Sequence, residues 1–107
     1  MIKFSVRDFS FVSGNHISKL HSLFHQWHID PHLTQNAAIS FLAVVDDRAE
    51  KIEKLALGAA DLFDVEVRKG LSLLTIRHYT QAILAEFLEK KNIILRQQTA
   101  STIQVLF

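Results

Sequence analysis

The histidines of this sequence have the spacing that most suggests chemistry. His21, His25 and His28 lie four and three positions apart, and His32 follows four positions later. If the segment is helical, the first three share one side of the helix, and histidines spaced in this way can hold zinc. The chain has no cysteine, and no Asp or Glu lies within this helical stretch to complete a ligand set. A His-rich metal-binding protein therefore stays an alternative, and we predict no metal site.

Acidic pairs are the other candidates for chemistry. Asp46 and Asp47 are adjacent, and Asp61 and Asp64 are three positions apart. Spacing alone gives neither pair the pocket that a general acid or base needs. The sequence contains none of the short motifs of serine hydrolases, zinc proteases, P-loop proteins or dinucleotide-binding folds. We predict no catalytic residue in this chain.

The stretch Ser13-Gly14-Asn15-His16 could bind an anion. It follows an alternating apolar segment and precedes the helical spacing of Ile17, Leu20, Phe24 and Trp27. At the start of that helix, free backbone N–H groups and the positive end of the helix dipole would stabilise a carboxylate. The alternative is an ordinary helix cap made by the side chain of Ser13 or Asn15.

The elements that position these residues belong to a chain of 107 residues. This length suits one core or two small ones and is too short for an ordinary two-domain enzyme. A content of 49% hydrophobic and 21% charged residues excludes disorder. The net charge of +1 gives no electrostatic reason to expect nucleic acid or an anionic membrane as partner. The positive mean hydropathy suggests that a partner covers some apolar surface.

No targeting or membrane-spanning segment is visible in the sequence. Charges at Lys3, Arg7 and Asp8 interrupt the apolar start that a signal peptide would need. The longest apolar run, residues 41–45, is far too short to span a membrane. We expect the protein in the cytoplasm.

Hydrophobic periodicity predicts two successive units in an α+β fold. Residues 1–68 read as strand, helix, strand, strand, helix, strand, which is the order of a ferredoxin-like βαββαβ sandwich with both helices on one face. The first strand is predicted over residues 2–12, the first helix ends at Asp30-Pro31, and the second helix covers residues 48–63. Residues 69–107 repeat the pattern as βαββ, so the second unit is incomplete.

An internal repeat supports this division. Residues 4–9 match residues 74–79 in character at an offset of 70, and residues 35–41 match residues 99–105 at an offset of 64. The second copy is therefore expected to be six residues shorter in its strand-to-helix loop or its helix. Unrelated strands of similar composition are the alternative.

The same segments resemble a known family. Residues 29–41 (IDPHLTQNAAISF), residues 65–76 (VEVRKGLSLLTI) and residues 98–105 (QTASTIQV) look like the paired ACT domains at the C-terminus of aspartate kinases. The sequence of residues 35–41 resembles the branch of this family found in Bacteroidetes-type bacteria. The resemblance covers nearly the whole chain and rests on order and spacing together.

The resemblance implies a regulatory fragment, with residues 1–68 as the first ACT domain and 69–107 as part of a second. The parent enzyme would phosphorylate L-aspartate with ATP on the way to lysine, threonine and methionine, and ATP and magnesium would belong to its kinase domain, with no cofactor in this fragment. A helix and strand from before the first domain would complete the second. The expected partners are an amino-acid effector, the kinase domain of the same chain and a second copy, paired through the ACT sheets.

The resemblance also places the effector contacts on the first strand-to-helix loop and on the second strand. The matching residues are Ser13, Gly14, Asn15, His16, Ile17, His32, Gln35 and Asn36. At two places this sequence departs from the family, because His32 stands where an aspartate grips the effector and Asn36-Ala37-Ala38 replaces Thr-Ser-Glu. The identity of the effector stays open, and a stand-alone ACT-like interaction module without a ligand is the alternative function.

Overall fold

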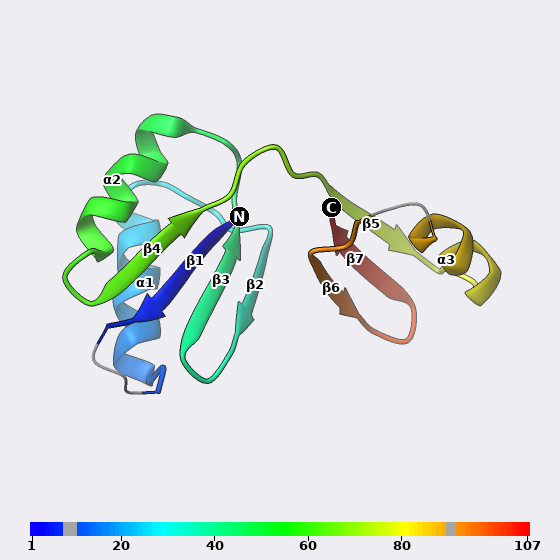
Figure 1. Ribbon diagram of the computed structural model, residues 1–107, viewed down its shortest axis with the longest axis horizontal. Helices are drawn as coiled ribbons and strands as arrows, with labels where there is room; N and C mark the ends of the chain where they lie inside the picture. The colour runs from blue at the N-terminus through cyan, green and yellow to red at the C-terminus, as the bar shows by residue number, and fades with distance from the viewer. Residues whose placement is uncertain (8–10, 90–91) are drawn as a thin grey trace. The chain divides into compact units, whose positions relative to one another are not determined.

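The computed structural model describes residues 1–7, 11–89 and 92–107, which form two compact units, Met1–Lys69 and Gly70–Phe107. Each unit is described by itself (Figure 1). Unit 1 contains β1 (Ile2–Val6), α1 (Gly14–Gln26), β2 (Leu33–Asn36), β3 (Ser40–Val44), α2 (Ala49–Ala59) and β4 (Phe63–Val67).

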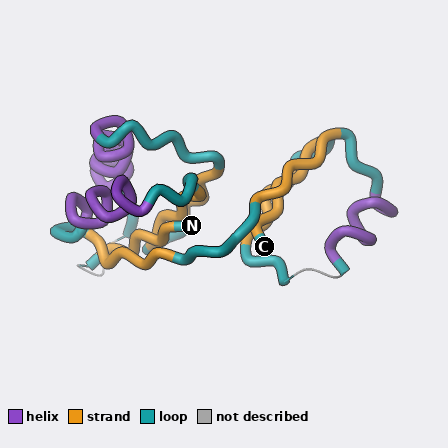
Figure 2. Tube along the Cα trace, turned by 90° about the horizontal axis from the view of Figure 1, so that it is seen from above, coloured by secondary structure: helices purple, strands orange, loops and turns teal. Residues whose placement is uncertain are grey.

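Unit 1 is a four-stranded antiparallel sheet with strand order β2-β3-β1-β4. Both helices lie on the same side of this sheet, as Figure 2 shows, and α1 contacts α2. This arrangement is a ferredoxin-like βαββαβ sandwich, so the predicted fold class is confirmed. The central strand β1 is short, because it ends at Val6, while residues 8–10 of the predicted strand lie outside the described residues.

Phe4 lies at the centre of the unit 1 core. Its side chain is fully buried, and its ring contacts those of Phe24, Phe41 and Phe63 at centroid distances of 6.2, 6.4 and 5.8 Å. Aromatic pairs at these distances contribute about 0.5–1.5 kcal/mol each beyond the burial of their area. Because α1 supplies Phe24 and the two neighbouring strands supply the other rings, Phe4 joins one helix and three strands.

Unit 2 has the same beginning and a different end. It contains β5 (Leu73–Arg77), α3 (Gln81–Leu88), β6 (Leu95–Gln98) and β7 (Thr102–Leu106), with strand order β5-β7-β6. The order corresponds to β1-β3-β2 of unit 1. Among the described residues, no strand takes the place that β4 has beside β1. The core is small, with Leu84, Ile103 and Val105 buried at its centre.

The strand pairings correct the predicted repeat. In the two hairpins, Asn36 pairs with Phe41 as Gln98 pairs with Ile103, so the second and third strands are offset by 62 residues. Because Phe4 pairs with Phe41 and Ile76 pairs with Ile103, the first strands are then offset by 72. The predicted offsets of 70 and 64 are each wrong by two. A slip of two residues keeps every side chain on its own face of a strand, so the apolar pattern cannot exclude it. Unit 2 is thus ten residues shorter between these strands, where six were expected.

The end of α1 also differs from the prediction. The helix stops at Gln26 and not at Asp30-Pro31. His28 adopts a left-handed conformation with a φ of 53°, and the N–H of Ile29 bonds to the carbonyl of Phe24 at 2.8 Å. These are the features of a Schellman motif, in which a left-handed residue ends the helix and an apolar residue after it enters the core. The burial of Ile29, and not the proline, determines where this helix ends.

The second helix is likewise shorter than predicted. α2 ends at Ala59, and the predicted residues 60–63 form a turn followed by the first residue of β4. Phe63 is completely buried as a strand residue opposite Val6. Its apolar side chain suits both a helix stripe and a buried strand, and the contact with Phe4 favours the strand.

His28→Gly should stabilise unit 1. A left-handed residue with a side chain costs about 1–2 kcal/mol, and glycine avoids this cost but loses about 0.5–1 kcal/mol through its greater freedom when unfolded. We expect the free energy of unfolding to rise by up to about 1 kcal/mol, measured by denaturant titration. His25→Gly, inside α1, is the matched control and should lower it by about 1 kcal/mol. Equal effects of the two variants would contradict the Schellman assignment.

Candidate functional site

The predicted loop forms the N-terminus of α1. Ser13 is the N-cap residue, and Gly14, Asn15 and His16 form the first turn. Ile17 donates its N–H to the carbonyl of Ser13 at 3.1 Å and packs partly buried against the core. The first turn contains no acidic side chain, so the positive end of the helix has no negative charge of its own.

The side chain of His16 caps the start of its own helix. The N–H of Ser13 donates to Nδ1 of His16 at 3.0 Å, and the Ser13 hydroxyl lies 3.0 Å from the same nitrogen. The imidazole ring also packs edge-on against Phe63 at 5.6 Å. Two contacts therefore hold this side chain, so His16 orients the loop. The backbone N–H groups of Gly14 and Asn15 are the donors that the first turn offers to a ligand.

The eight predicted effector residues do not form one cluster. Residues 13–17 and Asn36 lie near one end of β2, and His32 lies at the other. Asn36 lies at the end near the α1 start, because the N–H of Val12 bonds to the carbonyl of Ala38 at 2.8 Å in the turn after β2. His32 precedes the other end, and Gln35 lies between. Four residues of extended chain separate His32 from Asn36, which is about 13 Å along the strand. The helix start and His32 are thus too far apart for one small amino acid.

His32 has a partner that the sequence did not suggest. Its Nε2 lies 2.8 Å from a carboxylate oxygen of Asp46, with both side chains at least half exposed. The hydrogen bond from His32 and the nearby imidazole charge hold the pKa of Asp46 below its usual value. The hairpin brings these residues together, since β2 begins opposite the point where β3 ends. A carboxylate therefore lies beside the position where the resemblance implies one, although another segment supplies it.

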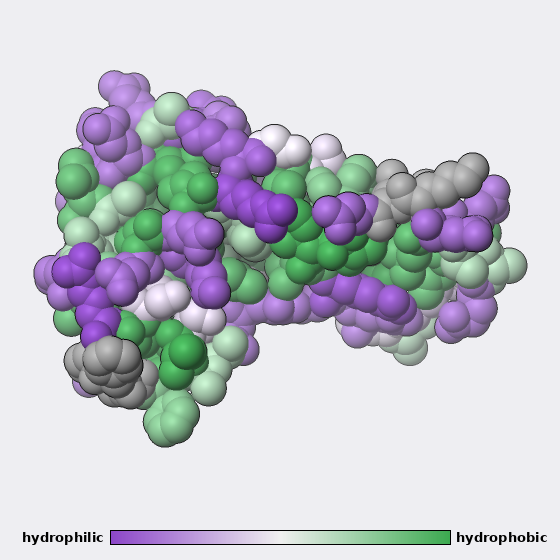
Figure 3. All heavy atoms as spheres, viewed as in Figure 1, coloured by the Kyte–Doolittle hydropathy of each residue, from purple (hydrophilic) through white to green (hydrophobic). Residues whose placement is uncertain are grey.

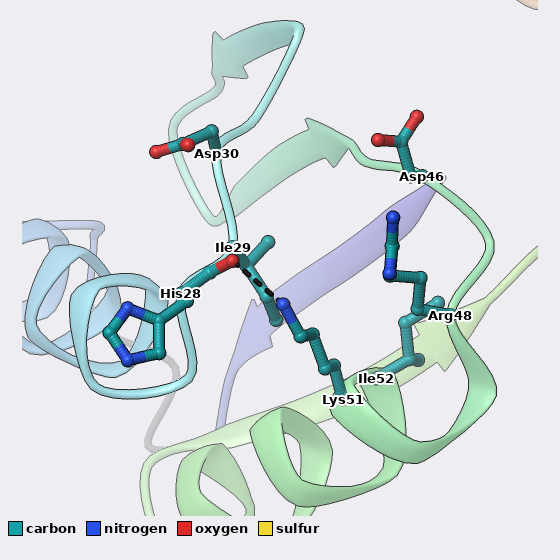
Figure 4. A pocket seen from close by; sticks show the side chains of 7 residues that line it. All are labelled: His28, Ile29, Asp30, Asp46, Arg48, Lys51 and Ile52. Atoms are coloured by element: carbon teal, nitrogen blue, oxygen red, sulfur yellow. Dashed lines mark hydrogen bonds between the residues drawn. The ribbon is translucent and has the colours of Figure 1, made fainter.

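A small hollow lies next to this ion pair (Figure 4). Its volume is about 40 Å³, and it is lined by His28, Ile29, Asp30, Asp46, Arg48, Lys51 and Ile52. Nζ of Lys51 donates to the carbonyl of His28 at 3.1 Å and so ties α2 to the end of α1. The hollow has room for one to a few water molecules, since about 10–15 Å³ of such volume holds one, and not for an amino acid.

A larger groove of about 400 Å³ lies between α2 and β4. Its wall includes Leu57, which is 72% exposed, and its floor includes the buried Phe63. Arg7 and Asp64 form an ion pair of 3.1 Å at its side. None of the predicted effector residues lines this groove. Figure 3 shows apolar side chains reaching the surface between polar ones on the face in view.

The histidine spacing does not produce a ligand cluster. The ring of His21 packs edge-on against Phe24 and Phe41 at 6.0 and 6.2 Å. Among residues 1–7, 11–89 and 92–107, no three His, Asp or Glu side chains are placed to hold a metal ion. In the same residues, no helix has the length and apolar character needed to cross a membrane.

No protein-family model and no curated protein matches the sequence. Solved structures do match the fold. A proposed C-terminal regulatory domain of aspartate kinase from Porphyromonas gingivalis W83, a member of the Bacteroidetes, superposes with a TM-score of 0.79 at 13% identity, over 98% of this chain and 77% of that one. Escherichia coli aspartokinase III, in its T-state with lysine and aspartate, gives 0.76 at 16% identity over 99% of this chain and 26% of that one.

The chain has the fold of an aspartate kinase regulatory domain. The regulatory subunit of the Thermus thermophilus enzyme, in its ligand-free form, matches as well, with a TM-score of 0.62 at 14% identity over 98% of this chain and 79% of that one. The resemblance noted in the sequence is therefore confirmed at the level of the fold. The chain spans about a quarter of the length of the whole E. coli enzyme.

The pairing of His32 with Asp46 can be tested by titration. In the wild type, the carboxyl of Asp46 should titrate below the ordinary value of 3.8, and His32→Ala should return it towards that value. Lys51→Gln, on another wall of the hollow, is the control and should leave the midpoint unchanged. NMR of the carboxyl carbon measures all three proteins.

The lowered pKa of Asp46 also predicts how the stabilisation by the His32–Asp46 pair depends on pH. A carboxyl whose pKa is lower in the folded than in the unfolded state stabilises the fold above its unfolded pKa, and this contribution is lost as pH falls through the folded pKa. The difference in unfolding free energy between wild type and His32→Ala should therefore shrink on acidification through that range. A difference that grows would contradict the assignment.

Proposed function

We propose that this chain is a non-catalytic regulatory module of an aspartate kinase, which binds an amino acid and transmits that binding to a kinase domain of the same chain. The observation that carries the proposal is that the likeness to such domains extends over 98–99% of the chain, through both units. The E. coli relative was solved with lysine and aspartate, and amino-acid effectors are the ligand class that we carry over to this chain. ATP and magnesium would act in the kinase domain. We expect this assembly in the cytoplasm.

We assign the carboxylate of the effector to the start of α1. The N–H groups of the first turn have no partner within the helix, so we assign those of Gly14 and Asn15 as donors, and no acidic residue of the first turn competes for them. A negative charge at this position also interacts favourably with the helix dipole, by about 0.3–1 kcal/mol at an exposed site. Asn36 is at the end of β2 that lies near the start of α1, and its side chain is the candidate partner for the amino group of the effector.

The distance between Asn36 and His32 determines how many modules one binding site needs. A site that uses residues 13–17 together with His32 and Gln35 needs two modules, because one small amino acid cannot extend over both ends of β2. In a homodimer, the helix start of one copy could approach the second strand of its partner. We therefore propose a dimer as the binding form. His32 and Asp46 would then contact the effector side chain from the second copy.

A stand-alone interaction module is the second candidate function. It is favoured by the exposed apolar side chains of Phe11 and Ile39, which are 74% and 59% exposed near the predicted loop. Isolated exposed residues of this kind are common, whereas a contiguous patch indicates a binding surface. Amino-acid binding separates the two functions, since a docking module without a ligand binds no amino acid.

Gly14→Asp should abolish effector binding without unfolding the chain. The added carboxylate occupies the first turn, where it repels the carboxylate of an incoming amino acid, while a charge of this sign stabilises the helix start. A Cβ atom added at position 14 meets no atom of the described residues within 4 Å. We expect the wild type to bind one of lysine, threonine, methionine or aspartate in calorimetry, and the variant to bind it at least about tenfold more weakly.

Gln81→Glu is the matched control, because it adds an acidic residue to the first turn of α3 instead. It should leave the affinity unchanged. Loss of binding in Gln81→Glu, with normal binding in Gly14→Asp, would place the site in unit 2. Absence of heat with all four amino acids would remove the sensing function and leave the interaction module.

A further inference from the structure

The outer edge of β4 lies beside the groove between α2 and β4 in unit 1. Among the described residues, β4 pairs with β1 alone, so its other edge has no strand beside it (Figure 1). Arg68 exchanges two backbone hydrogen bonds with Met1, at 2.8 and 2.9 Å. Bonded and non-bonded residues alternate along an antiparallel pair. The N–H and C=O groups of Phe63, Val65 and Val67 are therefore directed away from β1.

Small and apolar side chains form the wall of the groove. Ala56 and Ala60 lie four positions apart on one side of α2, and their short side chains leave space between the helix and the sheet. The exposed Leu57 lies beside them, and the half-buried Val65 lies across from them on β4. The volume of about 400 Å³ is within the range of clefts that bind ligands. A bulky apolar side chain would therefore fit into the groove.

An extended segment is the partner that fits both the edge and the groove. A strand added to β4 would bond to its outward N–H and C=O groups, and every second side chain of that strand would point to the side of α2. A helix laid along the groove would cover the apolar side chains but would leave the backbone groups of the edge without a protein partner. The geometry therefore favours an added strand over a docked helix.

The charged side chains of β4 determine the chemistry of such a strand. Asp64 and Glu66 alternate with the apolar residues of β4 and lie on the face of the sheet that the helices leave open. The nearest cations are on the β1 side, because Arg7 pairs with Asp64 at 3.1 Å and Lys3 lies opposite Glu66. Lysine or arginine residues of an added strand would lie directly opposite the two carboxylates. Opposite charges in such cross-strand pairs stabilise a sheet.

A second copy of β4 is a poor partner in the register that pairs the whole strand. If two β4 strands paired antiparallel about Val65, Asp64 of each copy would lie directly opposite Glu66 of the other. Like charges in that position are destabilising. Natural edge strands also resist pairing through lysine or proline residues, and β4 contains neither. The edge therefore disfavours its own sequence and favours a basic one.

We propose that the β4 edge and the groove beside it bind an extended segment of another protein, in which basic and apolar residues alternate. The segment pairs antiparallel, as the other strands of this sheet do. An apolar residue opposite Val65 enters the groove, and the basic residues on each side of it lie opposite Asp64 and Glu66. A shift of two positions would remove one of these charge pairs, so the charges select the register.

This inference goes beyond amino-acid sensing and does not depend on it. None of the eight predicted effector residues belongs to β4 or lines the groove. The alternative occupants of the edge are a second copy of the chain and a strand from another part of a longer chain.

A synthetic peptide tests the proposal on the full chain of 107 residues. The probe is acetyl-Thr-Val-Lys-Phe-Lys-Val-Thr-amide, which places its phenylalanine opposite Val65 and its lysines opposite the two carboxylates. We expect one peptide to bind per chain in calorimetry. Binding should slow amide hydrogen exchange at Phe63, Val65 and Val67, because the peptide carbonyls accept their N–H groups. The same peptide with glutamate in place of lysine should bind at least about tenfold more weakly.

Methylated peptides test the backbone hydrogen bonds. In the proposed register, the N–H of the peptide phenylalanine donates to the carbonyl of Val65. N-methylation of this phenylalanine removes the bond and should weaken binding at least about tenfold. N-methylation of one lysine, whose N–H is directed away from β4, is the matched control and should leave the affinity unchanged.

A charge variant tests the side-chain pairs. Glu66→Lys replaces an attractive cross-strand pair by a repulsive one and should weaken peptide binding at least about fivefold. Glu86→Lys, on the exposed side of α3, makes the same change in net charge in unit 2 and should leave the affinity unchanged. Both glutamates are exposed, and circular dichroism checks that both variants are folded.

The proposal is overturned if the peptide does not bind at about 1 mM, if methylation of its phenylalanine leaves the affinity unchanged, or if Glu66→Lys and Glu86→Lys weaken binding equally. It is also overturned if the amides of Val65 and Val67 are protected in the chain alone, since the edge would then already be covered. Dilution distinguishes a second copy from cover within the chain, because only the former is lost. A chain that binds the peptide and none of the four amino acids supports the β4 edge and removes sensing. The converse result overturns the edge and leaves sensing in place.

Discussion

The burial of Phe4 in the central strand is the constraint on which unit 1 depends. One ring contacts α1 and both neighbouring strands, so the positions of those elements are linked through it. Cores are packed densely, and a displaced ring would have to move all of its neighbours. The corresponding residue of unit 2 is Ile76, which is smaller, half-buried and covered by one helix. The difference between the two units begins at this pair of positions, because an aliphatic residue there leaves the first strand of unit 2 without a comparable centre.

Hydrophobic patterns predict the order of helices and strands in this fold but not where each one ends. The order of elements was predictable, since alternation and helical spacing differ clearly along residues 1–68. The ends were not, because they depend on contacts distant in sequence. Ile29 ends α1 by entering the core, and Phe63 leaves the α2 pattern to pack on Phe4. The repeat offsets were wrong by two residues for a related reason, as a strand pattern repeats every two positions.

The candidate site was predictable in part. The start of α1 was found from Ser13 and Gly14, since polar and glycine residues before an apolar stripe mark a helix start. The role of His16 was not, because its packing against Phe63 depends on a residue 47 positions away. In the sequence, Asp46 is distinguished only by its acidic neighbour Asp47. Its contact with His32 depends on the register of the β2–β3 hairpin. The structure fixes that register by pairing Leu33 with Val44, and the sequence alone does not.

The geometry of β2 limits how such a module could regulate an enzyme. A ligand shifts a conformational equilibrium only by as much as its affinities for the two states differ. An effector held only at the start of α1 would contact a segment already fixed by His16 and by the bond from Val12 to Ala38, so it would distinguish poorly between states. An effector that also contacts His32 or Gln35 of a second copy would bind one arrangement of the copies far better than another. The separation of about 13 Å along β2 therefore favours a site shared between modules, in which occupancy and assembly are coupled.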